Sequence, residues 1–301
     1  MIKVVGLSKS YNAHLAVDNI SFNVKDGEVF GFLGPNGAGK TTTMRLLCCL
    51  LKPTNGTATI GGHDVLTEPE KIRPLIGLLP ENHGLYEALS VKKNLMFHAQ
   101  LQGINESKAE ARMKHYLSMV DLWDRRDDLT GELSKGMKQK VAITRALLHE
   151  PKYLFLDEPT AGLDPQASKI IRELILSLKA KNRVIFINTH NLPEAQRICD
   201  RVAVLDKNVI SIGRPSDLEH SLFKSRLMIE LTKLSPRIIS ALKGYDYKRQ
   251  GNKLIVTINK PEKDNPLIIS KLVRAGASIK YASEESASLE DIYLKLIGDN
   301  R

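Results

Sequence analysis

The sequence of 301 residues predicts an α/β protein whose sheet is mostly parallel, with an inserted helical lobe and a small α+β domain behind it. Three observations predict this class. Short apolar runs, suited to strands buried on both faces, alternate with helical segments. A long helical stretch separates two of these runs, and the pattern changes to shorter elements after Gly213-Arg214-Pro215. We therefore expect two domains, at residues 1–218 and 219–301.

The elements of the first domain follow one another in a regular order. Met1–Gly6 has the character of a strand, and three apolar runs predict buried strands at Val29–Leu33, Tyr153–Leu156 and Val184–Ile187. A glycine-rich turn after the first run leads into a helix over Thr41–Leu51, and a helix over Ser168–Lys181 joins the last two runs. Because strands that alternate with helices form parallel sheets, ligands are expected at the carboxyl ends of these strands.

Two further sets of elements complete the predicted fold. The inserted lobe, at about residues 86–150, is expected to contain three helices, at Val91–Gln102, Lys108–Val120 and Lys135–Leu148. The second domain has the order strand, helix, strand, strand, helix, strand, which is typical of the ferredoxin-like unit. Its expected elements are Leu227–Leu231, a helix that begins at Ser235-Pro236, Tyr245–Arg249, Lys253–Ile258, Pro266–Ala275 and Ser278–Ala282, followed by a terminal helix over Leu289–Ile297.

The composition bounds the class of protein. The net charge is +10 and the pI about 9.4, but aromatic residues make up only 5% and no run of five or six basic residues occurs. The bases of a nucleic acid would have no surface of aromatic side chains on which to stack. We therefore expect the basic residues to form a solvated surface, and we expect no nucleic-acid partner. Proximity to anionic lipid head groups is an alternative source of the same bias.

Membrane insertion and secretion are also not expected. No apolar stretch approaches the roughly 18–20 residues that span a bilayer, and the start of the chain lacks the features of a signal peptide. The three cysteines, Cys48, Cys49 and Cys199, lack metal-binding spacing. We therefore expect reduced thiols in a cytosolic protein.

A phosphate-binding loop follows the first apolar strand. The run Gly34-Pro35-Asn36-Gly37-Ala38-Gly39-Lys40-Thr41-Thr42 fits the pattern G-x-x-x-x-G-K-[ST]. The glycines let backbone N–H groups converge on phosphate oxygens, and the helix that follows directs its positive end to the same place. We expect the whole run to bind a nucleotide, with Lys40 at the β- and γ-phosphates and the Thr41 hydroxyl at Mg²⁺.

Two carboxylates end the second apolar strand. Asp157 and Glu158 follow Tyr153–Leu156 directly and should lie at the sheet edge beside the phosphate-binding loop. Asp157 is the candidate ligand of Mg²⁺, and Glu158 is the candidate catalytic base that polarises the attacking water. The sequence therefore predicts hydrolysis of ATP.

These residues resemble the ATP-binding cassette (ABC) family over residues 1–218. Leu133-Ser134-Lys135-Gly136-Met137 is similar to the family signature L-S-G-G-Q. The resemblance implies a P-loop NTPase cassette with an N-terminal antiparallel β lobe. It also implies that Ser134 and Gly136 bind the γ-phosphate of ATP held by the opposite subunit of a dimer, where a helix N-terminus forms an anion site.

The resemblance assigns roles to four further residues. Asp164, in Ala161-Gly162-Leu163-Asp164, is similar to the loop that lines the dimer seam, and His190 is similar to the switch histidine that contacts the γ-phosphate. Tyr11 is similar to the aromatic residue that stacks on adenine, although a half-buried strand tyrosine is an alternative. Glu81 stands where the family usually has the glutamine that contacts Mg²⁺ and the membrane partner.

Two departures from the family pattern favour its exporter branch. Glu81 and Met137 both stand where the family usually has glutamine. Sequences of the exporter branch are also similar at Lys138-Gln139-Lys140 and at Ser288–Tyr293. The resemblance implies a subunit that couples ATP-driven dimer closure to export through a separate membrane-embedded permease. It would lie peripherally on the cytoplasmic face of the membrane, as a homodimer or as a heterodimer with a related ATPase.

Other kinds of protein remain as alternatives. An ABC importer ATPase shares these motifs, and so does a non-transport ABC ATPase of translation or DNA repair. Translation members usually carry two cassettes in one chain, whereas this chain has one phosphate-binding loop. A regulatory module that only senses ATP is a further alternative, against which Asp157, Glu158 and His190 argue.

Overall fold

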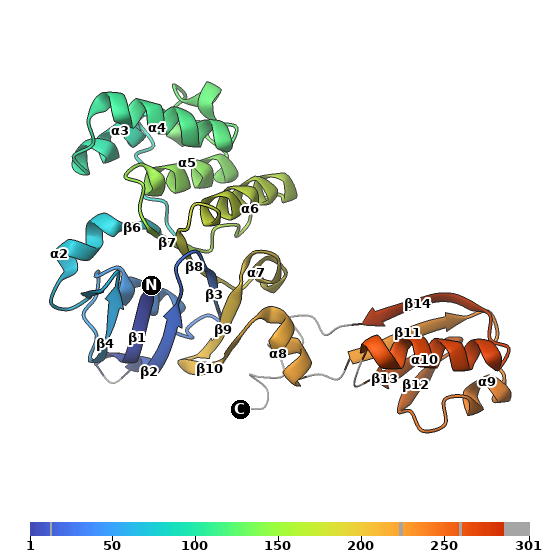
Figure 1. The fold of residues 1–301 in the computed structure, drawn as a ribbon. Coiled ribbons are helices and arrows are strands. Elements are labelled where there is room, and N and C mark those ends of the chain that lie inside the picture. Colours follow the sequence, from blue (N-terminus) through green and yellow to red (C-terminus); the bar gives the residue numbers. More distant parts are fainter. Residues whose placement is uncertain (13, 223–224, 259–260, 286–301) are drawn as a thin grey trace. The chain divides into compact units, whose positions relative to one another are not determined.

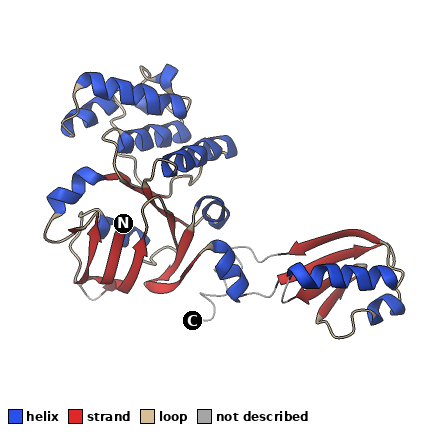
Figure 2. Ribbon diagram, in the orientation of Figure 1, coloured by secondary structure: helices blue, strands red, loops and turns tan. Residues whose placement is uncertain are grey.

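The computed structural model describes residues 1–12, 14–222, 225–258 and 261–285 (Figures 1 and 2). The chain forms two compact units that divide between Arg214 and Pro215, whereas the sequence analysis placed the boundary after Leu218. Across these described ranges, no helix combines the length and the apolar character that a membrane span requires.

The central sheet of the first unit has the strand order β10-β9-β3-β8-β7-β6 and is parallel except for its β9–β10 pair. Its strands are β3 (Val29–Leu33), β6 (Ile76–Leu79), β7 (Tyr153–Asp157), β8 (Val184–Thr189), β9 (Arg201–Asp206) and β10 (Asn208–Gly213). Every residue of β3, β7 and β8 is buried. These are the three apolar runs of the sequence, so the predicted α/β class with a mostly parallel sheet is confirmed.

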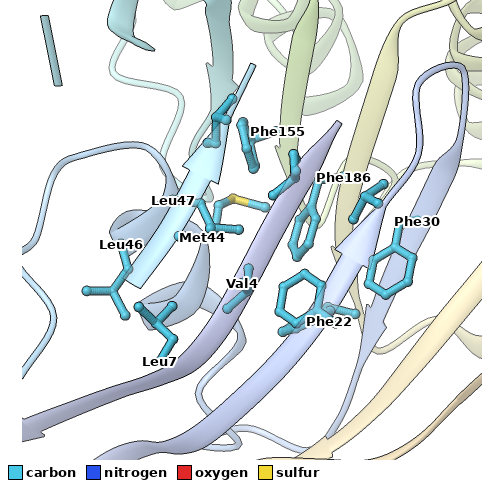
Figure 3. Close-up of a cluster of buried hydrophobic side chains, with 14 of the residues drawn as sticks. Val4, Leu7, Phe22, Phe30, Met44, Leu46, Leu47, Phe155 and Phe186 are labelled. Carbon is cyan, nitrogen blue, oxygen red and sulfur yellow. The ribbon is translucent and has the colours of Figure 1, made fainter. Parts of the chain in front are cut away.

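A second, antiparallel sheet has the strand order β2-β1-β4-β5 and forms a lobe. Two of its strands precede β3 in the chain and two follow it. It consists of β1 (Ile2–Tyr11), β2 (His14–Val24), β4 (Asn55–Ile60) and β5 (His63–Asp64). Its inner side chains share one core with the central sheet and with helix α1 (Lys40–Leu47), as Figure 3 shows. Aromatic rings pack between the two sheets: the centroid of the Phe22 ring, from β2, lies 5.5 Å from that of Phe30 and 5.0 Å from that of Phe32, both from β3.

The predicted helical lobe lies between β6 and β7 in the chain. It contains α3 (Val91–Leu101), α4 (Glu106–Met119) and α5 (Lys135–Leu147), which lie together in Figure 1. Each helix has a polar N-cap whose side chain accepts a backbone N–H: Ser90, Asn105 and Ser134. Such caps satisfy N–H groups that have no partner within the helix. The remaining short segments of the first unit are α2 (Pro69–Ile72), η1 (Arg73–Leu75), η2 (Trp123–Arg125), η3 (Thr130–Glu132) and α7 (Leu192–Ile198).

Local backbone geometry moves two helix ends away from their predicted positions. Helix α1 ends at Leu47 instead of Leu51, because Cys49 has a left-handed backbone with φ 56°. Helix α6 spans Pro165–Lys179 and begins before the expected Ser168. Asp164 caps it and Pro165 occupies its first turn, where a missing N–H costs nothing.

The second unit contains a four-stranded antiparallel sheet in the order β12-β13-β11-β14. Its elements are α8 (Pro215–Leu222), β11 (Ser225–Leu231), α9 (Pro236–Ser240), β12 (Tyr247–Gln250), β13 (Lys253–Ile258), α10 (Pro261–Arg274) and β14 (Ile279–Glu285). This order and pairing confirm the predicted ferredoxin-like arrangement. Helix α10 begins before the expected Pro266, which lies inside it. The terminal helix predicted at Leu289–Ile297 lies outside the described residues.

Each unit has its own hydrophobic core, and this generates a prediction about stability. Leu254 is fully buried in the core of the second unit, whereas its neighbour Ile255 is half-buried. We expect Leu254→Ala to destabilise the second unit by about 2–5 kcal/mol. Ile255→Ala is the matched control on the other face of the strand and should cost less.

Differential scanning calorimetry checks this prediction. Leu254→Ala should lower the temperature of one unfolding transition and leave the transition of the first unit in place. Equal shifts of the whole heat-absorption profile would contradict the independence of the two cores.

Candidate functional site

The phosphate-binding loop connects β3 to α1 in a conformation that its glycines allow. Gly37 and Gly39 have φ values of 84° and 92°. A Cβ atom on Gly39 would lie 2.5 Å from the Ala16 carbonyl oxygen, and one on Gly34 would lie 2.6 Å from the Leu205 carbonyl oxygen. Both positions therefore require glycine, because any side chain would push the loop off the neighbouring backbone.

Lys40, the first residue of α1, lies beneath the loop. Its side chain is 8% exposed, and its Nζ donates to the carbonyl oxygens of Gly34 at 2.6 Å and Pro35 at 3.1 Å. Burial lowers the pKa of the ammonium group, and the negative charges of three nearby carboxylates oppose that shift: Glu158, Asp157 and Glu81. A buried cation with nearby backbone N–H groups suits an anionic ligand such as a polyphosphate.

Asp157 ends β7 with both carboxylate oxygens in hydrogen bonds. Thr41 Oγ1 donates to Oδ2 at 3.1 Å, and Asn188 Nδ2 donates to Oδ1 at 3.2 Å. Burial raises the pKa of this carboxyl group, the two hydrogen bonds oppose the shift, and the charges of Glu158 and Glu81 add to it. The hydroxyl of Thr41 and the carboxylates of Asp157 and Glu81 are the hard oxygen ligands that suit Mg²⁺ beside a phosphate, so these residues fit the predicted metal.

Glu158 is held by the end of β8. Its backbone has the left-handed φ of 48°, which is uncommon for a residue with a side chain, and its N–H donates to the Asn188 carbonyl at 2.9 Å. Thr189 Oγ1 donates to Glu158 Oε2 at 3.2 Å, and the His190 N–H donates to Oε1 at 3.0 Å. His190 Nδ1 lies 2.7 Å from the same oxygen. The carboxylate is therefore fixed in one orientation while the His190 ring stays exposed, at 65%.

These groups surround one pocket of about 300 Å³. The described residues that line it include the predicted Tyr11, Glu81, Asp157 and Glu158. They also include seven residues of the phosphate-binding loop: Pro35, Asn36, Gly37, Gly39, Lys40, Thr41 and Thr42. Gly34 and Ala38 are not among the residues that line this pocket. The Tyr11 ring is 42% exposed, with Lys9 Nζ 5.3 Å from its centroid. Tyr11 is the last residue of β1 and lines the pocket.

Outside the phosphate-binding loop, four predicted site residues are not among those that line this pocket: His190, which contacts the Glu158 carboxylate, and Ser134, Gly136 and Asp164. Ser134 caps α5, its Oγ accepting the Met137 N–H at 3.3 Å, and Asp164 caps α6, its Oδ1 accepting the Ala167 N–H at 2.8 Å. Gly136 packs so closely to α6 that an added Cβ would lie 3.4 Å from Ala167 Cβ. We call the start of α5 and the loop before α6 the second surface: its residues Ser134, Gly136 and Asp164 are not among those that line the pocket, whereas Lys135 of α5 lines a neighbouring groove together with Thr41 and Asp157.

Sequence reasoning missed three residues that organise the site. Asn188 and Thr189 bond Asp157 and Glu158, and the Gln139 amide donates to the Pro159 carbonyl at 2.9 Å, which ties α5 to the turn after Glu158. A signal for Asn188 was available. Asn188 is a polar residue that directly follows the apolar run of its strand, as Asp157 is. The two residues are register partners in the β7–β8 pair.

A larger groove of about 660 Å³ extends from Thr41, Glu81 and Asp157 toward the helical lobe. The segment after Glu81 is fastened to that lobe: Arg145 donates to the Gly84 carbonyl at 2.9 Å, and the Lys138 ammonium lies 2.9 Å from Glu87. A displacement of the lobe would therefore move Glu81 relative to Asp157.

Comparison with known proteins identifies relatives of the whole chain. A family model described as ABC transporter matches residues 17–161. The bacitracin transport ATP-binding protein of Bacillus licheniformis is 36% identical, over 99% of this chain and 97% of the relative. A Nod factor export ATP-binding protein of Burkholderia orbicola is 35% identical, over 97% of this chain and 95% of the relative.

A solved structure is similar to most of the chain. It is the dimeric structure of a post-hydrolysis state of an ATP-binding cassette bound to ADP and Pi. It has a TM-score of 0.66 and 26% identity, and the match covers 71% of this chain and 98% of that chain.

The partly buried His98 ring, in a pocket of about 400 Å³ beside the groove, generates a prediction about pH. Burial first, and the positive charges of Arg145 and His149 second, lower the pKa of His98 to about 4. The unfolded chain therefore binds a proton as the pH falls through about 6.5, whereas the folded chain does not until about pH 4. The free energy of unfolding should decline across this window, and His98→Gln should reduce the decline by about 1 kcal/mol, a value discounted for partial exposure.

Urea unfolding of both proteins between pH 7 and 4 measures this difference. The exposed His115 provides the control variant His115→Gln, which should leave the decline unchanged. An identical pH profile for His98→Gln and the parent would refute the assignment.

Proposed function

This chain belongs to the ABC transporter family, and we propose that two copies close around ATP to drive export through a separate membrane-embedded permease. Its family membership makes it an ATP-binding subunit that hydrolyses ATP. One observation carries the proposal. The chain bears a pocket that fits a nucleotide, and the signature residues Ser134 and Gly136, at the start of α5, are not among the residues that line it.

Within one chain, each residue of the pocket has a proposed role. Gly34–Thr42 bind the triphosphate, with Lys40 exchanging its two carbonyl partners for phosphate oxygens, and Tyr11 stacks on adenine. Thr41, Asp157 and Glu81 would hold Mg²⁺, which offsets phosphate charge when bound. Glu158 accepts a proton from the attacking water, and His190 fixes the orientation of that carboxylate.

The second surface completes the site of the other copy. In a two-fold dimer, the same patch of each copy meets the partner, so Ser134 and Gly136 of one copy can face the phosphates bound to the other. The N-terminal end of α5 supplies backbone N–H groups and a favourable dipole for this contact. Asp164 lies in the loop that lines the seam. The solved dimeric cassette with ADP and Pi supports this arrangement.

Coupling to the permease runs through the segment after Glu81. This segment touches the metal site at one end and is bonded to α5 and α3 at the other, since Arg145 and Asn94 hold its backbone. Exposed apolar side chains occur in this segment and on α3: Tyr86, at 56%, whose ring centroid lies 5.5 Å from that of Phe97, at 41%, and Leu101, at 68%. We assign this surface to the permease, with the chain peripheral on the cytoplasmic face of the membrane. No nucleic acid takes part.

The direction of transport follows from the relatives. One relative is named for export of Nod factor and another for bacitracin transport, and each match covers at least 97% of this chain, including its second unit. The replacement of two family glutamines by Glu81 and Met137 agrees with that branch. Export is therefore favoured over import.

The role of Glu158 generates a direct test. Glu158→Gln keeps the size of the side chain and its hydrogen-bond partners but removes the base, so kcat should fall by about 10²–10⁴. ATP affinity should stay within a few-fold of the parent, because the phosphate-binding loop is intact. Phosphate release and ATP binding by isothermal titration calorimetry measure the two quantities.

Glu173→Gln is the matched control, because this glutamate is exposed on α6 and pairs only at 3.8 Å with Lys169 among the described residues. It should hydrolyse ATP at the parental rate. Near-normal turnover by Glu158→Gln would rule out the base assignment.

A further inference from the structure

Asn188 is a buried polar residue at the end of an otherwise apolar run. Its side chain is fully buried, and the four residues before it in β8, Val184–Ile187, are buried and apolar. Within the described part of the chain, its Oδ1 atom has no hydrogen-bond partner. A buried amide with an unpaired oxygen is costly, and such local conflicts concentrate at functional sites.

The only strong interaction of the Asn188 side chain, among described residues, is with Asp157. Its Nδ2 donates to Asp157 Oδ1 at 3.2 Å, and its second contact, with Met44 Sδ at 3.8 Å, involves a weak acceptor. The main-chain carbonyl of Asn188 binds the Glu158 N–H, but any residue could provide that bond. Among the described residues, Asp157 is therefore the one strong hydrogen-bond partner of the Asn188 side-chain amide.

The Asn188 contact makes the two oxygens of Asp157 unequal. Oδ1 is capped by the amide of Asn188, whereas Oδ2 faces the Thr41 hydroxyl at 3.1 Å. Thr41 and Asp157 are two of the residues that would hold the metal, and Oδ2 is the Asp157 oxygen on the Thr41 side. Without the cap, the carboxylate could rotate and present either oxygen.

We propose that Asn188 is a positioning residue for magnesium, which fixes Asp157 so that Oδ2 rather than Oδ1 meets the metal. The inference rests on the proposed function, because it needs Mg²⁺ and ATP in this pocket. Groups that orient a metal ligand from behind typically change metal affinity by about 10- to 100-fold when they are removed. Loss of the Asn188 amide should weaken the metal without weakening the nucleotide.

Mn²⁺ is the probe, and all variants carry Glu158→Gln so that ATP is not consumed. Asn188→Leu keeps the branched shape and the number of side-chain heavy atoms but has no donor. Electron paramagnetic resonance titration with ATP present should show Mn²⁺ binding weaker by about 10- to 100-fold than in the Glu158→Gln parent. ATP affinity in the presence of EDTA should stay within about two-fold, since the backbone loop that holds the phosphates is untouched.

A second variant and a control keep the result interpretable. Asn188→Ser fits without strain, but its hydroxyl is too short to reach Asp157, so it should weaken Mn²⁺ in the same way. Thr144→Val removes another fully buried oxygen without a partner in the described chain, on α5. It should leave Mn²⁺ affinity unchanged.

Each outcome decides a separate point. Parental Mn²⁺ affinity in both Asn188 variants would overturn the inference alone, and so would an equal loss of ATP affinity in EDTA, which indicates general damage. If the Glu158→Gln parent itself bound no Mn²⁺ with ATP, the proposed function would fail and the inference with it. Weak Mn²⁺ with intact metal-free ATP binding supports the role of Asn188.

Discussion

The parallel pairing of three buried strands is the constraint on which the rest of the structure depends. In the order β3-β8-β7, the carboxyl ends of all three strands reach the same edge of the sheet. Because each strand is wholly buried, its register is fixed by packing on both faces. The phosphate-binding loop, the Asp157–Glu158 pair and the Asn188–His190 run are thereby brought together from distant parts of the sequence.

Electrostatics then gives that edge its chemistry. One buried cation, Lys40, faces three carboxylates, so the pocket holds an excess of negative charge near the place where phosphates are expected. A divalent cation held by Thr41, Asp157 and Glu81 would offset this excess of negative charge. The hydrogen bonds to Asp157 and Glu158 hold both carboxylates in advance, so little reorganisation is left for the reacting complex.

The sequence predicted what depends on local pattern, and missed what depends on long-range register. The bounds of β3 match the apolar run Val29–Leu33, and the phosphate-binding loop followed from its motif. The four residues of β6, Ile76–Leu79, are too few to show a pattern, and the left-handed Cys49 that ends α1 early has no sequence signature. The partnership of Asn188 with Asp157 needs the strand order, which no local pattern contains. The proposed role of Ser134 in the site of a second copy came from the resemblance to the ABC family, because no contact within one chain indicates it.

The central claim is that each copy supplies what the pocket of the other lacks, and assembly tests it most directly. Sedimentation velocity of Glu158→Gln should show a monomer without nucleotide and a dimer at saturating ATP and Mg²⁺. Adding Ser134→Glu, which places a negative charge against the partner's γ-phosphate, should keep the protein monomeric while each copy still binds ATP. A Glu158→Gln protein that stays monomeric under these conditions with its permease present, or a Ser134→Glu variant that dimerises as well as its parent, would contradict the account.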